Sequence, residues 1–248
     1  SSPSLVRVLI IPDTHRPYHD TRAWDLVLQV GRAFHPQNLV VIGDLVDMYS
    51  ISRYSKDPVR AGRLREEITD VHHALDELDA LGATTKIFCA GNHEDRLRRY
   101  LQDKAPELFG VVDIPGLLGL NVRGWRYVPY KSDVRLGKLR LTHDTGTAGR
   151  YSTYRALDLY QHSVVVGHGH RLCYLVEGNA EGEFKLAAQF GWLGDVRQID
   201  YMHRARAQAD YVLGFGIGYL HPTTWVAYLV PVPIVNYTCV VNGQFYQG

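Results

Sequence analysis

Residues 163–171 read SVVVGHGHR, and this stretch decides between the fold classes open to the chain. Three consecutive valines without polar alternation are typical of a strand that is buried on both faces. The glycines that follow allow a sharp turn beside His168 and His170. Ligands of open α/β sheets bind at the carboxyl ends of the strands. The stretch therefore predicts a buried strand that carries two imidazoles to a binding edge, unless the histidines belong to an ordinary turn.

Short apolar runs alternate with helical patterns on the amino-terminal side of this stretch. The apolar runs predict strands at 5–11, 38–43, 86–90, 138–144 and 163–166. Apolar residues at helical spacing predict helices at 20–34, 59–81, 93–103 and 151–161. This alternation is typical of an α/β domain with a central sheet.

The pattern changes after residue 171, where apolar runs follow one another without helices between them. These runs predict a second, mainly antiparallel sheet, and they read LCYLVEG, EFKLAAQF, WVAYLVPVPIV and YTCVVNGQFY. Residues 105–137 are rich in glycine and proline, and we expect an irregular lid or insertion there. Because no linker or repeat is visible, residues 1–248 are predicted to form a single domain.

The composition is that of an ordinary globular protein. The 248 residues are 46% hydrophobic and 21% charged, and their formal net charge is +1. Three scattered cysteines without a CxxC pair exclude a zinc ribbon and a disulfide framework. Glycines and prolines interrupt the apolar region 211–241, which therefore does not predict a membrane helix. We expect a soluble, cytoplasmic protein that does not bind membranes.

Each of five predicted strands ends in side chains that can bind a metal ion. In chain order these are Asp13 and His15, Asp44 and Asp47, Asn92 and His93, His143, and finally His168 and His170. Taken singly, each group has an ordinary explanation: a turn, a helix cap, or a surface or core histidine. The carboxyl ends of strands meet at one sheet edge, so their joint placement favours a shared site.

The donor types indicate which ions the site suits. Oxygen and imidazole donors without cysteine suit Mn, Fe, Zn, Co or Ni. Without Asp47 and His93 the set has seven donors, which are too many for one ion but right for two. Two ions about 3.5–4 Å apart clamp a phosphoryl group and lower the pKa of a shared water to about neutral. Such a pair supplies a bridging hydroxide as the nucleophile.

As an ordered series these residues resemble the signature of the calcineurin-like metallophosphoesterase family. The series consists of Asp13-x-His15, Gly43-Asp44-x-x-Asp47, Gly91-Asn92-His93-Glu94, His143 and Gly167-His168-x-His170. The strings SRYSKDP, GWLGD and GFGIGY are similar to phage-type members of that family. The resemblance implies a four-layer αββα sandwich with two mixed central sheets and a metal site at the carboxyl ends of the strands.

The resemblance also allocates the residues between two divalent ions, with manganese favoured. One ion falls to Asp13, His15 and His170, the other to Asn92, His143 and His168, and Asp44 bridges the two. His93 is then the general acid or a charge-stabilising group. Asp47 is the candidate to orient the His93 ring, although it can also be a solvated helix residue.

The expected substrate is a phosphoester. In protein phosphatases of the family an Arg-Gly pair follows the second motif, whereas this chain has Met48 and Tyr49. Arg53, Arg96 and Arg150 are candidates to grip a phosphate, or they are solvated side chains. Arginines interleaved with tyrosines favour a phosphodiesterase acting on nucleotides or nucleic acid. The alternatives are a phosphomonoesterase, a nucleotide pyrophosphohydrolase, or a non-catalytic interaction scaffold on the same fold.

Overall fold

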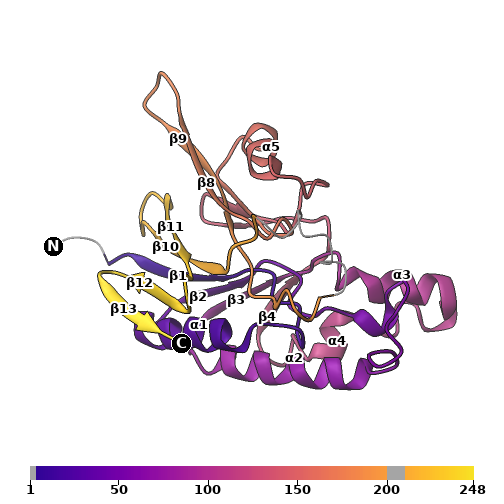
Figure 1. Cartoon of the computed structure of the whole chain (residues 1–248). Helices are drawn as coiled ribbons and strands as arrows, with labels where there is room; N and C mark the ends of the chain where they lie inside the picture. Colours follow the sequence, from indigo (N-terminus) through magenta and orange to yellow (C-terminus); the bar gives the residue numbers. More distant parts are fainter. Residues whose placement is uncertain (1–3, 200–209) are drawn as a thin grey trace.

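Two mixed β-sheets pack face to face in the computed structural model, which describes residues 4–199 and 210–248 (Figure 1). The first sheet has the spatial order β11 (Ala227–Pro233), β10 (Gly214–Leu220), β1 (Val6–Ile11), β2 (Asn38–Val41), β3 (Thr85–Cys89) and β4 (Trp125–Val128). Strands β1 to β4 are parallel, and β10 joins β1 antiparallel. The second sheet has the order β5 (Val134–Leu136), β6 (Leu139–Leu141), β7 (Val164–Val166), β9 (Phe184–Phe190) and β8 (Leu172–Gly178).

Helices cover the outer faces of both sheets. The apolar sides of α1 (Thr21–Phe34) and α2 (Leu64–Asp79) pack on the first sheet, and α4 (Ile114–Leu118) packs beside α2. The Asp20 carboxylate caps α1 by accepting a hydrogen bond from the Ala23 N–H at 3.0 Å. Helix α5 (Ser152–Leu159) covers the second sheet. The αββα prediction is therefore confirmed.

The remaining elements are short or lie at the margins of the sandwich. Helix α3 (Asp95–Lys104) follows β3, and two 3-10 turns span Tyr49–Ile51 and Pro106–Leu108. Strands β12 (Thr238–Val241) and β13 (Gln244–Gln247) form a separate hairpin, and β13 contacts α1. Among residues 4–199 and 210–248, no helix has the length and apolarity to cross a bilayer.

The expected second, mainly antiparallel sheet is wrong in its membership. Only β8 and β9 of the predicted carboxyl-terminal strands join that sheet, whereas β11 extends the first sheet through β10. Strand β10 was not predicted because Gly214, Gly216 and Gly218 alternate along it. Its glycines make room for larger neighbours: a Cβ on Gly216 would lie 2.6 Å from the Phe190 ring.

Two predicted segments also differ in detail. The helix expected over 59–81 begins only at Leu64, and residues before it form turns. The segment 105–137 is not wholly irregular, because it contains α4, β4 and β5, and β4 pairs with β3 at the edge of the first sheet. Its role as a lid stays a prediction, as does the single-domain organisation.

Candidate metal centre

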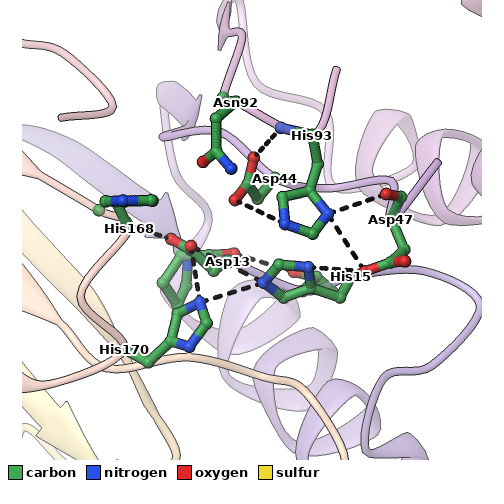
Figure 2. A network of polar contacts seen from close by, with 12 residues as sticks. Asp13, His15, Asp44, Asp47, Asn92, His93, His168 and His170 are labelled. Atoms are coloured by element: carbon green, nitrogen blue, oxygen red, sulfur yellow. Dashed lines mark hydrogen bonds and ion pairs between the residues drawn. The ribbon is translucent and has the colours of Figure 1, made fainter. Parts of the chain in front are cut away.

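The predicted metal ligands gather where the carboxyl ends of the two sheets meet (Figure 2). Asp13, Asp44 and Asn92 follow β1, β2 and β3 of the first sheet, whereas His143 follows β6 of the second. His168 and His170 follow β7 of the second sheet. The first sheet therefore supplies the oxygen donors together with the imidazole of His15, and the second sheet supplies three imidazoles.

The backbone at these ligands is held in a conformation that side chains rarely adopt. His15, Asp44, His168 and His170 have φ angles of 56°, 51°, 68° and 56°. Such left-handed backbone costs about 1–3 kcal/mol per residue and persists where the surroundings enforce it. Here the Thr14 and His15 N–H groups both donate to the Asp44 carbonyl at 2.9 Å, which ties the first loop to the second.

One group of donors is formed by Asp13, His15 and His170. The His170 Nε2 atom lies 3.0 Å from Asp13 Oδ2 and 3.1 Å from His15 Nε2. All three residues are buried, and burial lowers the pKa of His170 to about 4, so its ring is neutral. A neutral imidazole can offer a lone pair, and an ionised carboxylate beside it suits a cation. The chemistry of this donor set therefore fits a divalent ion.

A second group is formed by Asp44, His143, His168 and the amide of Asn92. The His143 Nε2 atom lies 3.3 Å from Asp44 Oδ2 and 3.2 Å from Asn92 Oδ1. His143 Nδ1 donates to the Ile42 carbonyl at 2.8 Å, which fixes the ring so that Nε2 faces the site. Asp44 also clusters with His15 and His93, so its carboxylate lies between the two groups.

Opposite charges that lie close together shift the pKa values of the groups in this site. Burial raises the pKa of the Asp44 carboxyl, but the neighbouring His143 and His93 more than offset this and hold it well below its usual range. For His143, burial lowers the pKa, yet the Asp44 and Asp13 carboxylates raise it to about 10. Without a metal ion, a proton on His143 thus supplies positive charge between the carboxylates. A divalent ion at the same place would replace that proton.

His93 and Asp47 lie at one side of these donors, as the sequence predicts. The His93 Nδ1–H donates to the Asp47 carbonyl at 2.8 Å, and an Asp47 carboxylate oxygen lies 3.2 Å from the same nitrogen. That carboxylate also contacts His15 Nδ1 at 3.1 Å. Asp47 is buried rather than solvated, and it orients two imidazoles, of which only His93 had been expected.

Two supporting side chains were missed from the sequence. Glu94 accepts three backbone N–H bonds, from Asp44 at 2.9 Å, Val46 at 3.1 Å and Gly91 at 2.7 Å. Burial and the Asp44 charge raise the pKa of Glu94 to about 7. Gln189 of β9 donates to the Gly167 carbonyl at 2.5 Å and so supports the loop of His168. The string GNHE carries a signal for Glu94, whereas nothing in the local sequence marks Gln189.

The three predicted phosphate-gripping arginines are not equivalent in the structure. Arg53 and Arg96 line a cavity that also reaches Asn92. Arg96 additionally donates to the Asp47 carbonyl at 2.8 Å. Arg150 is exposed just before α5, outside the described residues that line this cavity. Their contact with substrate stays a prediction.

The residues described above lie in the part of the chain that matches a family of known proteins. The sequence model described as calcineurin-like phosphoesterase matches residues 6–216, which include every ligand named above. The chain belongs to the calcineurin-like phosphoesterase family. It is 28% identical to the Gene 54 protein of Mycobacterium phage D29 over 180 residues, or 66% of this chain and 69% of that protein.

This calcineurin-like phosphoesterase is also similar to a second phage protein and to a solved structure. The Gene 54 protein of Mycobacterium phage L5 is 27% identical over 180 residues, with the same coverage of 66% and 69%. The structure of Vacuolar Protein Sorting 29 from Cryptosporidium parvum has a TM-score of 0.51 and 14% identity, covering 97% of this chain and 94% of that one. At that identity the likeness concerns the fold alone.

Proposed function

We propose that this calcineurin-like phosphoesterase is a metal-dependent phosphodiesterase that acts on nucleotides or nucleic acid. The observation that carries the proposal is the convergence of carboxylate, amide and imidazole donors from both sheets, with His93 beside them. A set of this kind holds two ions, whereas a non-catalytic scaffold has no need to keep every donor in place.

The donors would hold two divalent ions, with the Asp44 carboxylate between the two groups. Asp13, His15 and His170 would hold one ion, and Asn92, His143 and His168 the other. Bound divalent ions orient the phosphoryl group and activate water for attack. The protein's own part is to keep the imidazole lone pairs turned inward, as the Ile42 carbonyl does for His143.

His93 is placed to move a proton. Its Nδ1–H donates to the Asp47 carbonyl, so Nε2 is the ring atom that faces Asp44, at 3.9 Å, and it accepts a hydrogen bond from Arg96 Nη2 at 3.3 Å. As a general acid, His93 would pass a proton taken up on Nε2 to the leaving oxygen of a phosphoester bound between the ligand groups. Asp47 fixes the ring orientation that this transfer requires.

The surroundings of Asp47 support a diester substrate over a monoester. Met48 and Tyr49, which stand where protein phosphatases of the family have Arg-Gly, are buried and carry no positive charge. The nearby Arg96 is engaged with Asp47. A monoester dianion would benefit from an added bidentate arginine, whereas a singly charged diester needs it less.

The test compares bis(p-nitrophenyl) phosphate with p-nitrophenyl phosphate on metal-stripped protein, with Mn, Zn or Ni added back. We expect metal-dependent turnover that favours the diester. His93→Asn should lower kcat about 100-fold or more, since general acid catalysis contributes about 10²–10⁴-fold. His162→Asn, at an exposed histidine outside the site, is the matched control.

The other outcomes are equally informative. A preference for the monoester would favour the phosphomonoesterase alternative. Failure to bind metal would favour the scaffold. Turnover that survives in His93→Asn would remove this histidine from the chemistry while leaving the ligand groups intact.

A further inference from the structure

A cavity of about 600 Å³ opens from the Asn92 side of the ligand cluster. It lies between the loop after the second motif and α3, and it reaches Lys104 at the end of that helix. Its lining contains seven cationic side chains but only two acidic ones. The formal net charge of the whole chain is +1, so this cavity concentrates positive charge that the protein as a whole lacks.

Some of these cations are engaged in ion pairs. Asp95 pairs with Arg98 at 2.7 Å and with Arg99 at 3.2 Å, and Arg96 lies 3.7 Å from the Asp47 carboxylate. The others are available: in the part of the chain that the structure describes, no acidic side chain forms an ion pair with Arg53, Lys56, Lys104 or Lys131. The acidic groups that face the cavity thus leave a surplus of positive charge.

This basic surface is longer than a single phosphate group. Helix α3 has 10 residues, which corresponds to about 15 Å at 1.5 Å per residue. Phosphates of one strand follow each other about every 3.4 Å along the axis of a B-form helix, and they lie farther apart in an extended single strand. Between Asn92 and Lys104 there is still room for more than one consecutive phosphate, which is more than a nucleoside monophosphate carries.

Tyrosines are interleaved with the cations. Tyr54 is 69% exposed and lines this cavity as well as a second one, of about 380 Å³, that reaches Asp47. Tyr100 projects from α3 and is also exposed. An exposed ring beside a phosphate-binding surface can stack an unpaired base, which a duplex does not offer.

We propose that this cavity is a binding subsite for single-stranded nucleic acid, with the strand along α3, its phosphates on the unpaired cations and a base on Tyr54. The inference rests on the proposed phosphodiesterase function and narrows its substrate class from nucleotides in general to an extended strand. It also implies cleavage within or near the end of a strand, at the linkage nearest Asn92.

Fluorescence anisotropy of labelled dT12 with phosphorothioate linkages, which resist hydrolysis, tests the proposal on the metal-loaded full chain. We expect dT12 to bind much more tightly than dT2. The double variant Lys56→Gln/Lys104→Gln should weaken dT12 binding and reduce the slope of log Kd against log salt by about 0.7 for each phosphate that the protein no longer neutralises. Tyr54→Ala should weaken binding at least about five-fold, whereas Tyr54→Phe should not.

The matched control is Lys138→Gln/Arg155→Gln, which removes two exposed cations outside the cavity. Equal binding by this control and by the cavity variant would overturn the proposal, as would equal affinity for dT2 and dT12. A duplex bound as tightly as dT12, without dependence on Tyr54, would also overturn it. Turnover of bis(p-nitrophenyl) phosphate by the wild-type protein tests the proposed function separately, because that small diester does not span the cavity.

Discussion

The most consequential single residue outside the ligand set is Glu94. Its two carboxylate oxygens accept hydrogen bonds from backbone N–H groups on both the second and the third ligand loops. Gly91 permits this approach, because a Cβ there would collide with the Asp44 carboxylate. Glu94 is therefore a positioning residue that sets the distance between the Asp44 carboxylate and Asn92.

Glu94→Ala should leave three buried N–H groups without an acceptor. An unsatisfied buried donor costs about 1–3 kcal/mol, so we expect the free energy of unfolding to fall by about 3 kcal/mol or more. Metal affinity should fall about 10- to 100-fold, as for other residues that orient ligands. Urea unfolding and metal titration measure both effects. Glu181→Ala, at an exposed turn, is the control, and an equally small effect in both variants would refute the role of Glu94.

The buried His19, which is not one of the predicted metal ligands, should make the stability of the protein depend on pH. Burial, assisted by the Arg16 charge, lowers the pKa of His19 to about 4, although Asp70 opposes this. Below about pH 6.5 the unfolded chain takes up a proton that the folded chain does not bind. Stability should therefore fall between about pH 6.5 and 4 and then stop falling, by roughly 3 kcal/mol in total from this group.

His19→Gln should flatten that part of the stability profile. Urea unfolding of the wild-type and variant proteins at several pH values between 4 and 7 measures the difference. His162→Gln, whose side chain is exposed, is the control and should retain the wild-type slope. An unchanged slope in His19→Gln would mean that the histidine titrates alike in both states.

At the scale of elements, the close packing between the sheets depends on β10. The Gly216 position faces Phe190 of β9, and a Cβ would lie 2.6 Å and 2.7 Å from two carbons of its ring. Gly216→Ala should destabilise the protein by about 1–3 kcal/mol, as overpacking typically does. Thermal or urea unfolding measures this destabilisation.

The control lies in a strand of the other sheet. A Cβ on Gly178 would have the Glu183 carbonyl oxygen 3.9 Å away, an ordinary van der Waals distance. Gly178→Ala should therefore change the free energy of unfolding by no more than about 0.5 kcal/mol. Equal destabilisation of the two variants would show that glycine matters in β10 for its backbone rather than for the space it leaves.

These contacts explain which elements the sequence could predict. The buried parallel strands and the amphipathic helices α1 and α2 follow from local periodicity, and they lie within or close to the expected ranges except at the start of α2. Strand β10 does not, since its alternating glycines carry no apolar pattern and make sense only opposite Phe190. The sequence of β11 resembles that of the other predicted carboxyl-terminal strands, so it does not indicate which sheet the strand joins. The pairing of β11 with β10 places it in the first sheet.

The candidate site was more predictable than the sheet order. Its ligands follow strands directly, so their positions in the sequence coincide with their positions at the edge. The contact of Asp47 with His15 and that of Gln189 with the His168 loop were not predicted, because they depend on contacts between distant segments. Spacing along the chain carries no information about such contacts.

At the scale of the whole molecule, bound divalent ions should stabilise the packing of the two sheets against each other, because each sheet supplies part of the donor set. An ion that binds only the folded state stabilises it by about 2.7 kcal/mol at 100 times its Kd. Chelation should lower the Tm, and added Mn or Zn should raise it in a concentration-dependent way. Differential scanning calorimetry measures both.

Asp13→Asn should blunt that response, because it removes a ligand charge, while Asp25→Asn on the exposed side of α1 should respond like the wild-type protein. A wild-type Tm that responds to neither chelator nor ions would contradict a structural contribution of the metals. Equal responses in Asp13→Asn and Asp25→Asn would place the stabilising ions elsewhere.

The division of the donors between two sheets also sets an order of assembly during synthesis. Asp13 and Asp44 leave the ribosome long before His143, and His170 emerges last of the seven. A nascent chain that stops short of β6 would hold these carboxylates with no imidazoles from the second sheet to balance them. The complete set of donors, and with it metal binding, would thus form only when the second sheet packs on the first.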